Sequence, residues 1–164
     1  MKMLKRIISQ LHTFVLWLLV SAIFWSWIFT FVTDTSPERK ITVYCKVPEV
    51  RDTALAVALE ERMPEGLRMI QVHSFDYVMF GVEAFYQGDI FIVPASAMAE
   101  YAELLAPVAG EEGARVYDAA AGSGAATSYI RYEDEDYFLF LGAGSAHLED
   151  GKALEVAKAL LALE

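Results

Sequence analysis

The sequence predicts an α/β protein, in which an N-terminal transmembrane helix precedes one three-layer α/β/α domain with a mostly parallel sheet. Three observations support this fold class. Residues 11–32 contain no Asp, Glu, Lys or Arg, although 22% of all residues are charged. Strand-like and helix-like segments alternate from residue 41 to residue 106, with the short loops that are typical of βαβ units. The length of 164 residues is sufficient for one ordinary domain plus a short additional element.

The apolar run 11–32 has the length of a membrane span. At about 1.5 Å per residue it forms a helix of roughly 33 Å, which crosses a hydrocarbon core of about 30 Å. Lys2, Lys5 and Arg6 precede it, and a cationic flank stays in the cytoplasm. We therefore expect a single-pass protein of the cell membrane with a cytoplasmic N-terminus and an extracytoplasmic C-terminal part.

The expected domain organisation follows from this span. Residues 1–10 form a cytoplasmic basic segment, 11–32 a signal anchor, 33–40 a linker and 41–164 the extracytoplasmic α/β domain. A cleaved signal peptide is the alternative, but its apolar region usually has about 7–15 residues and ends at a small-residue cleavage site. The run in this chain is longer and bulky to its end, which favours an uncleaved anchor.

Charge and cysteine content restrict the partners of the domain. Residues 34–164 contain all 23 acidic residues but only ten of the 13 basic ones, which gives a formal charge of −13. Such a domain repels nucleic acids and anionic lipid surfaces, so we expect no nucleic-acid partner. The single cysteine excludes an internal disulfide. We therefore expect a bacterial envelope setting without obligatory disulfide chemistry.

The segment 41–106 supports the α/β assignment element by element. A short apolar run rich in β-branched residues predicts a buried parallel strand at 41–45, and further strands are expected at 67–72 and 89–93. Apolar residues at helical spacing, with Ser74 and Ser96 as N-caps of the later two, predict helices at 52–63, 75–86 and 97–105.

The rest of the chain predicts more strand than helix. Residues 114–118 form a short strand. Segments 127–132 and 137–141 flank the acidic run 133–136, and together they predict a β-hairpin with a solvated acidic turn. A final helix is expected at 152–163, because its apolar residues recur at helical spacing.

Two short motifs carry a resemblance to a known family. They are Gly88-Asp89-Ile90-Phe91-Ile92-Val93-Pro94-Ala95-Ser96 and Leu104-Leu105-Ala106-Pro107. The pattern resembles bacterial extracellular solute-binding proteins, in which a strand of this kind leads into a helix that ends in a similar motif. The resemblance covers residues 40–107 and returns more weakly at 137–163. It implies the fold of one lobe of a type 2 periplasmic binding protein.

The chain departs from this family in two respects. Solute-binding proteins trap their ligand between two lobes, whereas only about 20 residues separate Pro107 from the strand expected at 127–132. A second lobe is therefore missing or reduced to the insert 116–137. Such proteins are also usually released or lipidated, whereas a helix anchors this chain. The resemblance thus implies a single reduced lobe with a membrane anchor.

Four residues form the candidate ligand site. In open α/β sheets, ligands bind beyond the carboxyl ends of the strands, where Lys46, His73, Ser74 and Ser96 follow the three expected strands. Backbone N–H groups at the helices that Ser74 and Ser96 begin can receive an anion or a carboxylate, and Lys46 adds a positive charge. The alternative is that both serines only cap their helices.

A group of aromatic residues occupies the second expected helix. Its members are Phe75, Tyr77, Phe80, Phe85 and Tyr86. They either line a ligand groove or belong to the core and the layer that covers the sheet.

The sequence predicts no catalytic residue, no metal and no cofactor. His73 with Asp76 and His147 with Glu149 form two loose pairs, but zinc needs three or four ligands at defined spacing. Cys45 would need a nearby histidine to act as a nucleophile, and His73 follows the neighbouring strand. A buried core cysteine is the commoner role.

The leading functional hypothesis is a non-enzymatic, membrane-anchored extracytoplasmic binding or interaction module. It binds a small solute or peptide at the strand ends, or a protein partner of an envelope complex, and residues 11–32 contact the membrane. A structural or assembly subunit without a ligand is the second hypothesis, and a hydrolase is the third. A concave, partly polar pocket favours a ligand, whereas a flat apolar patch favours a protein interface.

Overall fold

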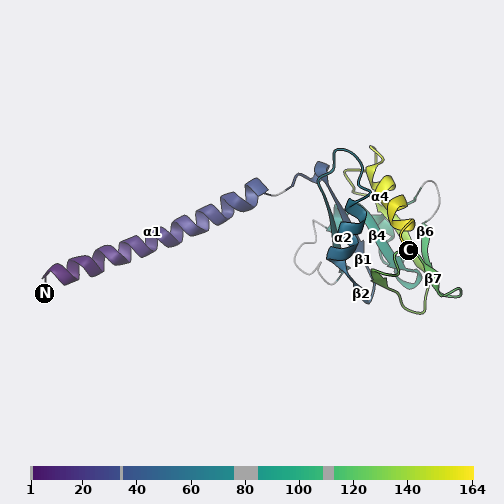
Figure 1. The fold of residues 1–164 in the computed structure, drawn as a ribbon, viewed down its shortest axis with the longest axis horizontal. Helices are drawn as coiled ribbons and strands as arrows, with labels where there is room; N and C mark the ends of the chain where they lie inside the picture. The colour runs from purple at the N-terminus through teal and green to yellow at the C-terminus, as the bar shows by residue number, and fades with distance from the viewer. Residues whose placement is uncertain (1, 34, 76–84, 109–112) are drawn as a thin grey trace. The chain divides into compact units, whose positions relative to one another are not determined.

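The computed structural model describes residues 2–33, 35–75, 85–108 and 113–164 (Figure 1). The chain divides into two compact units, Met1–Thr35 and Ser36–Glu164. The division falls inside the linker expected at 33–40. Each unit is described separately below.

The first unit is the helix α1, Lys2–Thr33. Its stretch Leu11–Phe29 is long and apolar enough to cross a membrane, and the structure buries no part of that stretch. Trp17, Trp25 and Trp27 are 65–67% exposed. A helix that exposes so much apolar surface fits a lipid environment. By length and composition it fits an anchor or a signal sequence, and its orientation stays a prediction.

The second unit is built on a mixed sheet of strand order β3-β1-β4-β9-β6-β7. Strands β1 (Lys40–Cys45), β3 (Met69–Ser74) and β4 (Ile90–Pro94) are parallel, with β1 between the other two. The parallel pairing of these strands confirms the βαβ unit that the sequence predicts from residue 41 onward. The helix between β1 and β3 is α2, Asp52–Glu60, which ends three residues before its predicted end.

The second half of the sheet is antiparallel. Strand β9 (Tyr137–Gly142) runs against β4, and β6 (Ala114–Asp118) runs against β9. The two-residue strands β5 (Leu105–Ala106) and β7 (Ser123–Gly124) pair with β9 and β6. The sheet is therefore parallel only in its first three strands.

The predicted hairpin of 127–132 with 137–141 is wrong. Strand β8 (Ile130–Arg131) pairs instead with β2 (Glu49–Val50) in a separate two-stranded sheet. The reason is that β9 is an interior strand, with β4 on one edge and β5 and β6 on the other. No edge of β9 is left for the residues before the acidic turn.

The helix predicted at 97–105 is also wrong. The structure has two 3₁₀ turns there, η3 (Ala95–Ala97) and η4 (Ala102–Leu104), before β5 begins. Leu105 pairs with Gly142 of β9, while Met98, Tyr101 and Leu104 pack on the aromatic face of the sheet. Pairing and packing together outweigh the weak helical preference of this small-residue segment. The helix predicted at 75–86 lies mostly outside the described residues.

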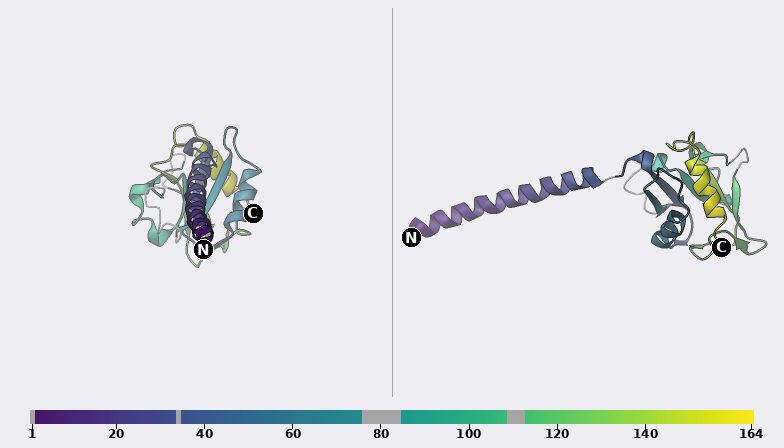
Figure 2. Two further views of the ribbon diagram at one scale, coloured as in Figure 1. Left: turned by 90° about the vertical axis from the view of Figure 1, so that its left-hand side faces the viewer. Right: turned by 45° about the horizontal axis from the view of Figure 1, so that its top comes forward.

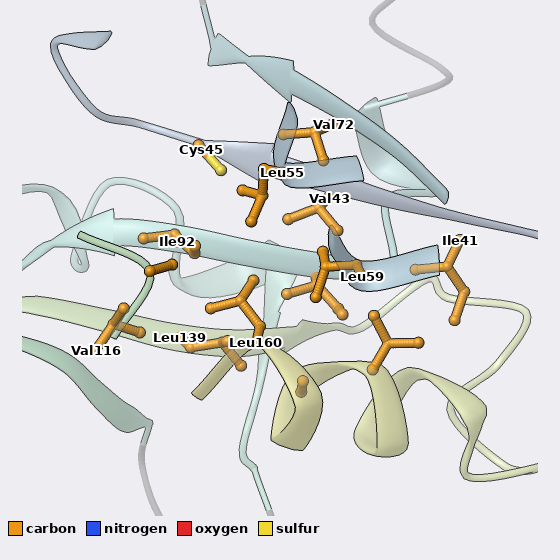
Figure 3. Packing of buried hydrophobic residues seen from close by; sticks show 14 of the residues in the cluster. Ile41, Val43, Cys45, Leu55, Leu59, Val72, Ile92, Val116, Leu139 and Leu160 are labelled. Carbon is orange, nitrogen blue, oxygen red and sulfur yellow. The ribbon is translucent and has the colours of Figure 1, made fainter. Parts of the chain in front are cut away.

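Side chains alternate between the two faces of the sheet, as the pleat requires. On one face Val43 and Ile92 pack against Leu55 and Leu59 of α2 and Leu160 of α4, all completely buried (Figure 3). Helix α4, Lys152–Leu161, contacts both α2 and β9, so the two helices cover this face together (Figure 2). The final helix is thus confirmed, two residues shorter than predicted.

The other face carries a layer of aromatic side chains. The rings of Tyr44, Phe91 and Phe140 leave the strands, and Phe85 and Phe75 pack on them. Ring centroids in this layer lie 5.0–6.5 Å apart, mostly in edge-to-face arrangements. Among the described residues, this layer and the 3₁₀ segment cover the second face. A mixed α/β domain is therefore observed.

Candidate binding cleft

A cleft of about 500 Å³ opens at the carboxyl edge of the three parallel strands. Strand β9 runs antiparallel to β4, so the loop before β9 reaches the same edge. The cleft is lined by residues that follow β1, β3 and β4 and by that loop, principally Lys46, Phe75, Ser96, Tyr101, Glu133 and Glu135. This edge is where open α/β sheets place their ligands.

Lys46 lies in the cleft, but its charge is already compensated. Its Nζ donates a hydrogen bond to Tyr101 Oη at 2.9 Å and lies 3.6 Å from Glu100 Oε2. The same nitrogen is 4.6 Å from the ring centroid of Tyr101 and 5.7 Å from that of Phe75. The hydrogen bond to Tyr101 is the main cause that raises the pKa of Lys46; partial burial opposes the shift, and Glu100 adds a smaller contribution that raises it. The lysine is therefore a cation held by an aromatic wall.

Ser96 also lines the cleft, but in a different role from the predicted one. It lies within η3 rather than at the N-cap of a helix. Its backbone N–H donates to Glu135 Oε2 at 3.2 Å. The donor predicted to receive a ligand anion is thus occupied by a carboxylate of the chain itself. The preceding N–H, of Ala95, donates to the carbonyl of Asp136 at 2.9 Å.

The acidic run 133–136 forms one side of the cleft. Burial and the nearby charges of Glu133 and Glu135 raise the pKa of Tyr137, against a hydrogen bond that its hydroxyl accepts from the N–H of Glu133. In the part of the chain that the structure describes, no basic side chain lies within ion-pair distance of Glu133 or Glu135. A neighbouring hollow of about 670 Å³ shares both glutamates and adds Asp134 and the basic side chain of Arg131.

His73 and Ser74 do not line this cleft. Ser74 is the last residue of β3 and pairs with Cys45 of β1. His73 pairs with Tyr44, and the two rings lie 5.7 Å apart on the aromatic face. Burial lowers the pKa of His73. The structure therefore brings together Lys46 and Ser96 but leaves the other two predicted site residues outside.

The arrangement separates the groups considered for catalysis. Cys45 belongs to the core on the helix-covered face and is completely buried, which raises the pKa of its thiol to about 12. His73 lies on the opposite face, so the two side chains do not form a nucleophile–base pair. No group of three potential metal ligands occurs in the described part of the chain. Asp76, the possible partner of His73, lies outside it.

His147 is a structural residue of the loop before α4. Its Nδ1 lies 3.0 Å from Asp150 Oδ2, and its Nε2 lies 3.1 and 3.2 Å from the carbonyl oxygens of Pro37 and Lys40. The ring is 1% exposed. It contacts Asp150 rather than Glu149, which the sequence pattern had paired with it.

The sequence analysis missed Tyr101, Glu133 and Glu135 as cleft residues. Tyr101 was placed in a helix, and the two glutamates were interpreted as part of a solvated hairpin turn. The antiparallel pairing of β9 with β4 brings the turn before β9 to the carboxyl edge of β4, and no feature of the sequence indicates that pairing. For Phe75 and Phe85, the sequence leaves open a ligand groove or the layer that covers the sheet. The structure places both side chains in the aromatic layer and also in the lining of the cleft.

Comparisons with protein-family models, curated proteins and solved structures found no significant match.

Proposed function

We propose that this chain is a membrane-anchored, extracytoplasmic binding module whose ligand occupies the carboxyl-edge cleft. The observation that carries the proposal is the cleft itself, with Lys46 and Ser96 in its lining. Its volume of about 500 Å³ lies within the range of small-molecule sites, about 300–1,000 Å³. Its lining combines aromatic rings with a few charged groups, as ligand sites usually do.

The proposal includes the finer fold and topology predicted from the sequence. We take the domain as a single reduced lobe of the solute-binding type, with α1 as a signal anchor. The three parallel strands with β1 in the middle support the lobe-like part. The unburied apolar helix supports anchoring, and the basic residues before it support a cytoplasmic N-terminus.

The experiment measures whether any small solute stabilises the full chain. The chain is placed in nanodiscs of zwitterionic phosphatidylcholine and melted in a scanning calorimeter with a panel of sugars, amino acids, carboxylates, amines and short peptides. Calorimetry is suitable because all three tryptophans lie in α1 and do not report on the domain. A ligand that binds only the folded state raises the midpoint, by mass action.

The matched variants are Ser96→Trp and Ser96→Ala. Ser96 is exposed at the cleft, so the indole fills the cavity while the methyl group leaves it open. A stabilising solute that loses its effect in Ser96→Trp and keeps it in Ser96→Ala supports the proposal. If no solute moves the midpoint, the binding proposal is wrong and the hypothesis of an assembly subunit without a ligand replaces it.

A further inference from the structure

The charged groups that line the cleft favour a ligand of the opposite charge from the one that the sequence predicts. Sequence reasoning assigns it an anion, on the basis of Lys46 and the backbone N–H groups after the strands. Glu100 and Tyr101 compensate Lys46, and Glu135 occupies the N–H of Ser96. Lys46 and the backbone N–H of Ser96 are therefore already engaged by groups of the chain.

The negative charge of the cleft remains available. Glu133 and Glu135 line it, and in the described residues neither has a basic side chain within ion-pair distance. Only one oxygen of Glu135 accepts the N–H of Ser96. An anion entering this space would meet two carboxylates at close range, which is unfavourable.

The aromatic wall adds a second, independent observation. Tyr101 and Phe75 hold the ammonium group of Lys46 at 4.6 and 5.7 Å from their ring centroids. Aromatic faces attract cations through the ring quadrupole. The chain's own lysine thus shows that a cation is stable in this environment, next to the rings that any ligand would contact.

From these contacts we infer that the cleft selects a ligand with a cationic group, an alkylammonium or a guanidinium, and an apolar body. The cation pairs with Glu133 and Glu135, and the apolar body packs on the rings of Phe75 and Tyr101. This inference rests on the proposed function and names its ligand class. The same chemistry is supplied by a free amine or by a lysine or arginine side chain of a protein.

The experiment compares probes of one shape and three charges. Binding of hexylammonium, hexanol and hexanoate to the full chain in phosphatidylcholine nanodiscs is measured by calorimetric titration at low and high salt. We expect hexylammonium to bind more tightly than the other two, and its affinity to fall as salt screens the carboxylates. An acetylated, amidated lysine tripeptide tests the protein source, because tighter binding than hexylammonium indicates a side chain and weaker binding a free amine.

The decisive variant is Glu133→Gln combined with Glu135→Gln. Glutamine keeps an acceptor for the N–H of Ser96 but removes both charges. Because the two carboxylates lie at or near the surface, we expect the affinity for hexylammonium to fall about 2- to 30-fold in this variant. Glu155→Gln is the matched control, since Glu155 is exposed on α4, which covers the other face of the sheet.

Three outcomes overturn the inference. Preferential binding of hexanoate makes the cleft an anion site, and equal binding of hexanol and hexylammonium makes it an apolar one. The third is that no amine binds while another solute of the broader panel does. In all three cases the proposed binding function survives. If nothing binds at all, both the function and the ligand class are wrong.

Discussion

The imidazole of His147 and the carboxylate of Asp150 face each other, with 3.0 Å between Nδ1 and Oδ2. The second ring nitrogen faces the carbonyl oxygens of Pro37 and Lys40. Because carboxylates and carbonyls only accept hydrogen bonds, a ring nitrogen that bonds to one of these oxygens acts as the donor. His147 thereby fixes the first residues of the domain to the loop that begins α4.

Removing this ring should destabilise the domain. In His147→Leu, the carbonyls of Pro37 and Lys40 lose their donor in a buried position, so we expect the free energy of unfolding to fall by about 2–4 kcal/mol. Urea denaturation followed through the tyrosines measures it, because all eight tyrosines lie in the second unit. Glu149→Gln, at an exposed neighbour, is the control and should change stability by less than about 0.5 kcal/mol. Equal stability of the leucine variant and the wild type would contradict the fixing role.

Asp150 should make stability depend on pH in the acid range. Partial burial opposes the shift, but hydrogen bonds from Lys152 and His147 lower the pKa of Asp150 well below its ordinary value of 3.8. A lowered folded-state pKa stabilises the protein above pH 3.8, and this stabilisation is lost as the pH falls toward the folded-state value. The wild type should therefore exceed Asp150→Asn in melting midpoint at pH 6, and the difference should shrink below pH 4.

The comparison of the wild type with Asp150→Asn also separates the pH dependence caused by Asp150 from the pH dependence caused by Asp89. Burial raises the pKa of Asp89, although hydrogen bonds from Ser145 and Thr42 oppose the shift. The contribution of Asp89 to stability has the opposite sign. A raised folded-state pKa stabilises the folded protein at low pH, and this stabilisation is lost as the pH rises. Asp89 is present in both proteins, so its effect cancels in the difference. A constant difference between pH 6 and pH 2 would show that Asp150 is not the group responsible.

Gly142 is expected to tolerate no side chain. A Cβ at this position would collide with the carbonyl oxygen of Gly88. The backbone N–H of Gly142 itself donates to the carbonyl of Asp89 at 2.9 Å. The end of β9 therefore cannot move away from Gly88 and Asp89 without losing this hydrogen bond. We expect Gly142→Ala to destabilise the domain by about 1–3 kcal/mol in the same urea assay.

The control for this prediction is the exposed Val57→Ala in α2, where more than half of the side chain is in solvent. It should leave the unfolding midpoint almost unchanged. Should Gly142→Ala match the wild type, the close approach of β9 to Gly88 would be incorrect.

Membrane attachment is tested by fractionation. We expect the full-length chain, expressed in a bacterial host, to stay in the membrane pellet after alkaline carbonate washing, because α1 is long and apolar enough to span the hydrocarbon core. Protease added outside intact spheroplasts should degrade the domain. A soluble fragment that begins near residue 35 would instead show a cleaved signal sequence, and protection from the protease would reverse the orientation.

The parallel part of the fold was predictable because strands that are buried on both faces have nearly continuous apolar sequences. Ile41–Cys45 and Ile90–Val93 are almost continuously apolar, which is typical of covered parallel strands. The antiparallel part was not predictable in the same way. Residues 127–132 have a strand pattern, but their pairing depends on which edges of β9 are already occupied. That depends on residues distant in sequence.

The edge of the sheet at which the cleft opens was predictable, but most of the cleft lining was not. The rule for open α/β sheets correctly places Lys46 and Ser96 at one edge. The groups that engage these two residues are distant in sequence: Glu135 lies 39 residues after Ser96, and Tyr101 lies 55 residues after Lys46. The contacts of Lys46 with Glu100 and Tyr101 depend on the two 3₁₀ turns of this segment, which a helix predicted at 97–105 does not anticipate.

The buried thiol of Cys45 gives this molecule a built-in reporter. It is the only cysteine in the chain, and no part of it is accessible to solvent. Alkylating reagents can therefore reach it only when the core opens. The rate of alkylation therefore reports how often the core of the domain opens.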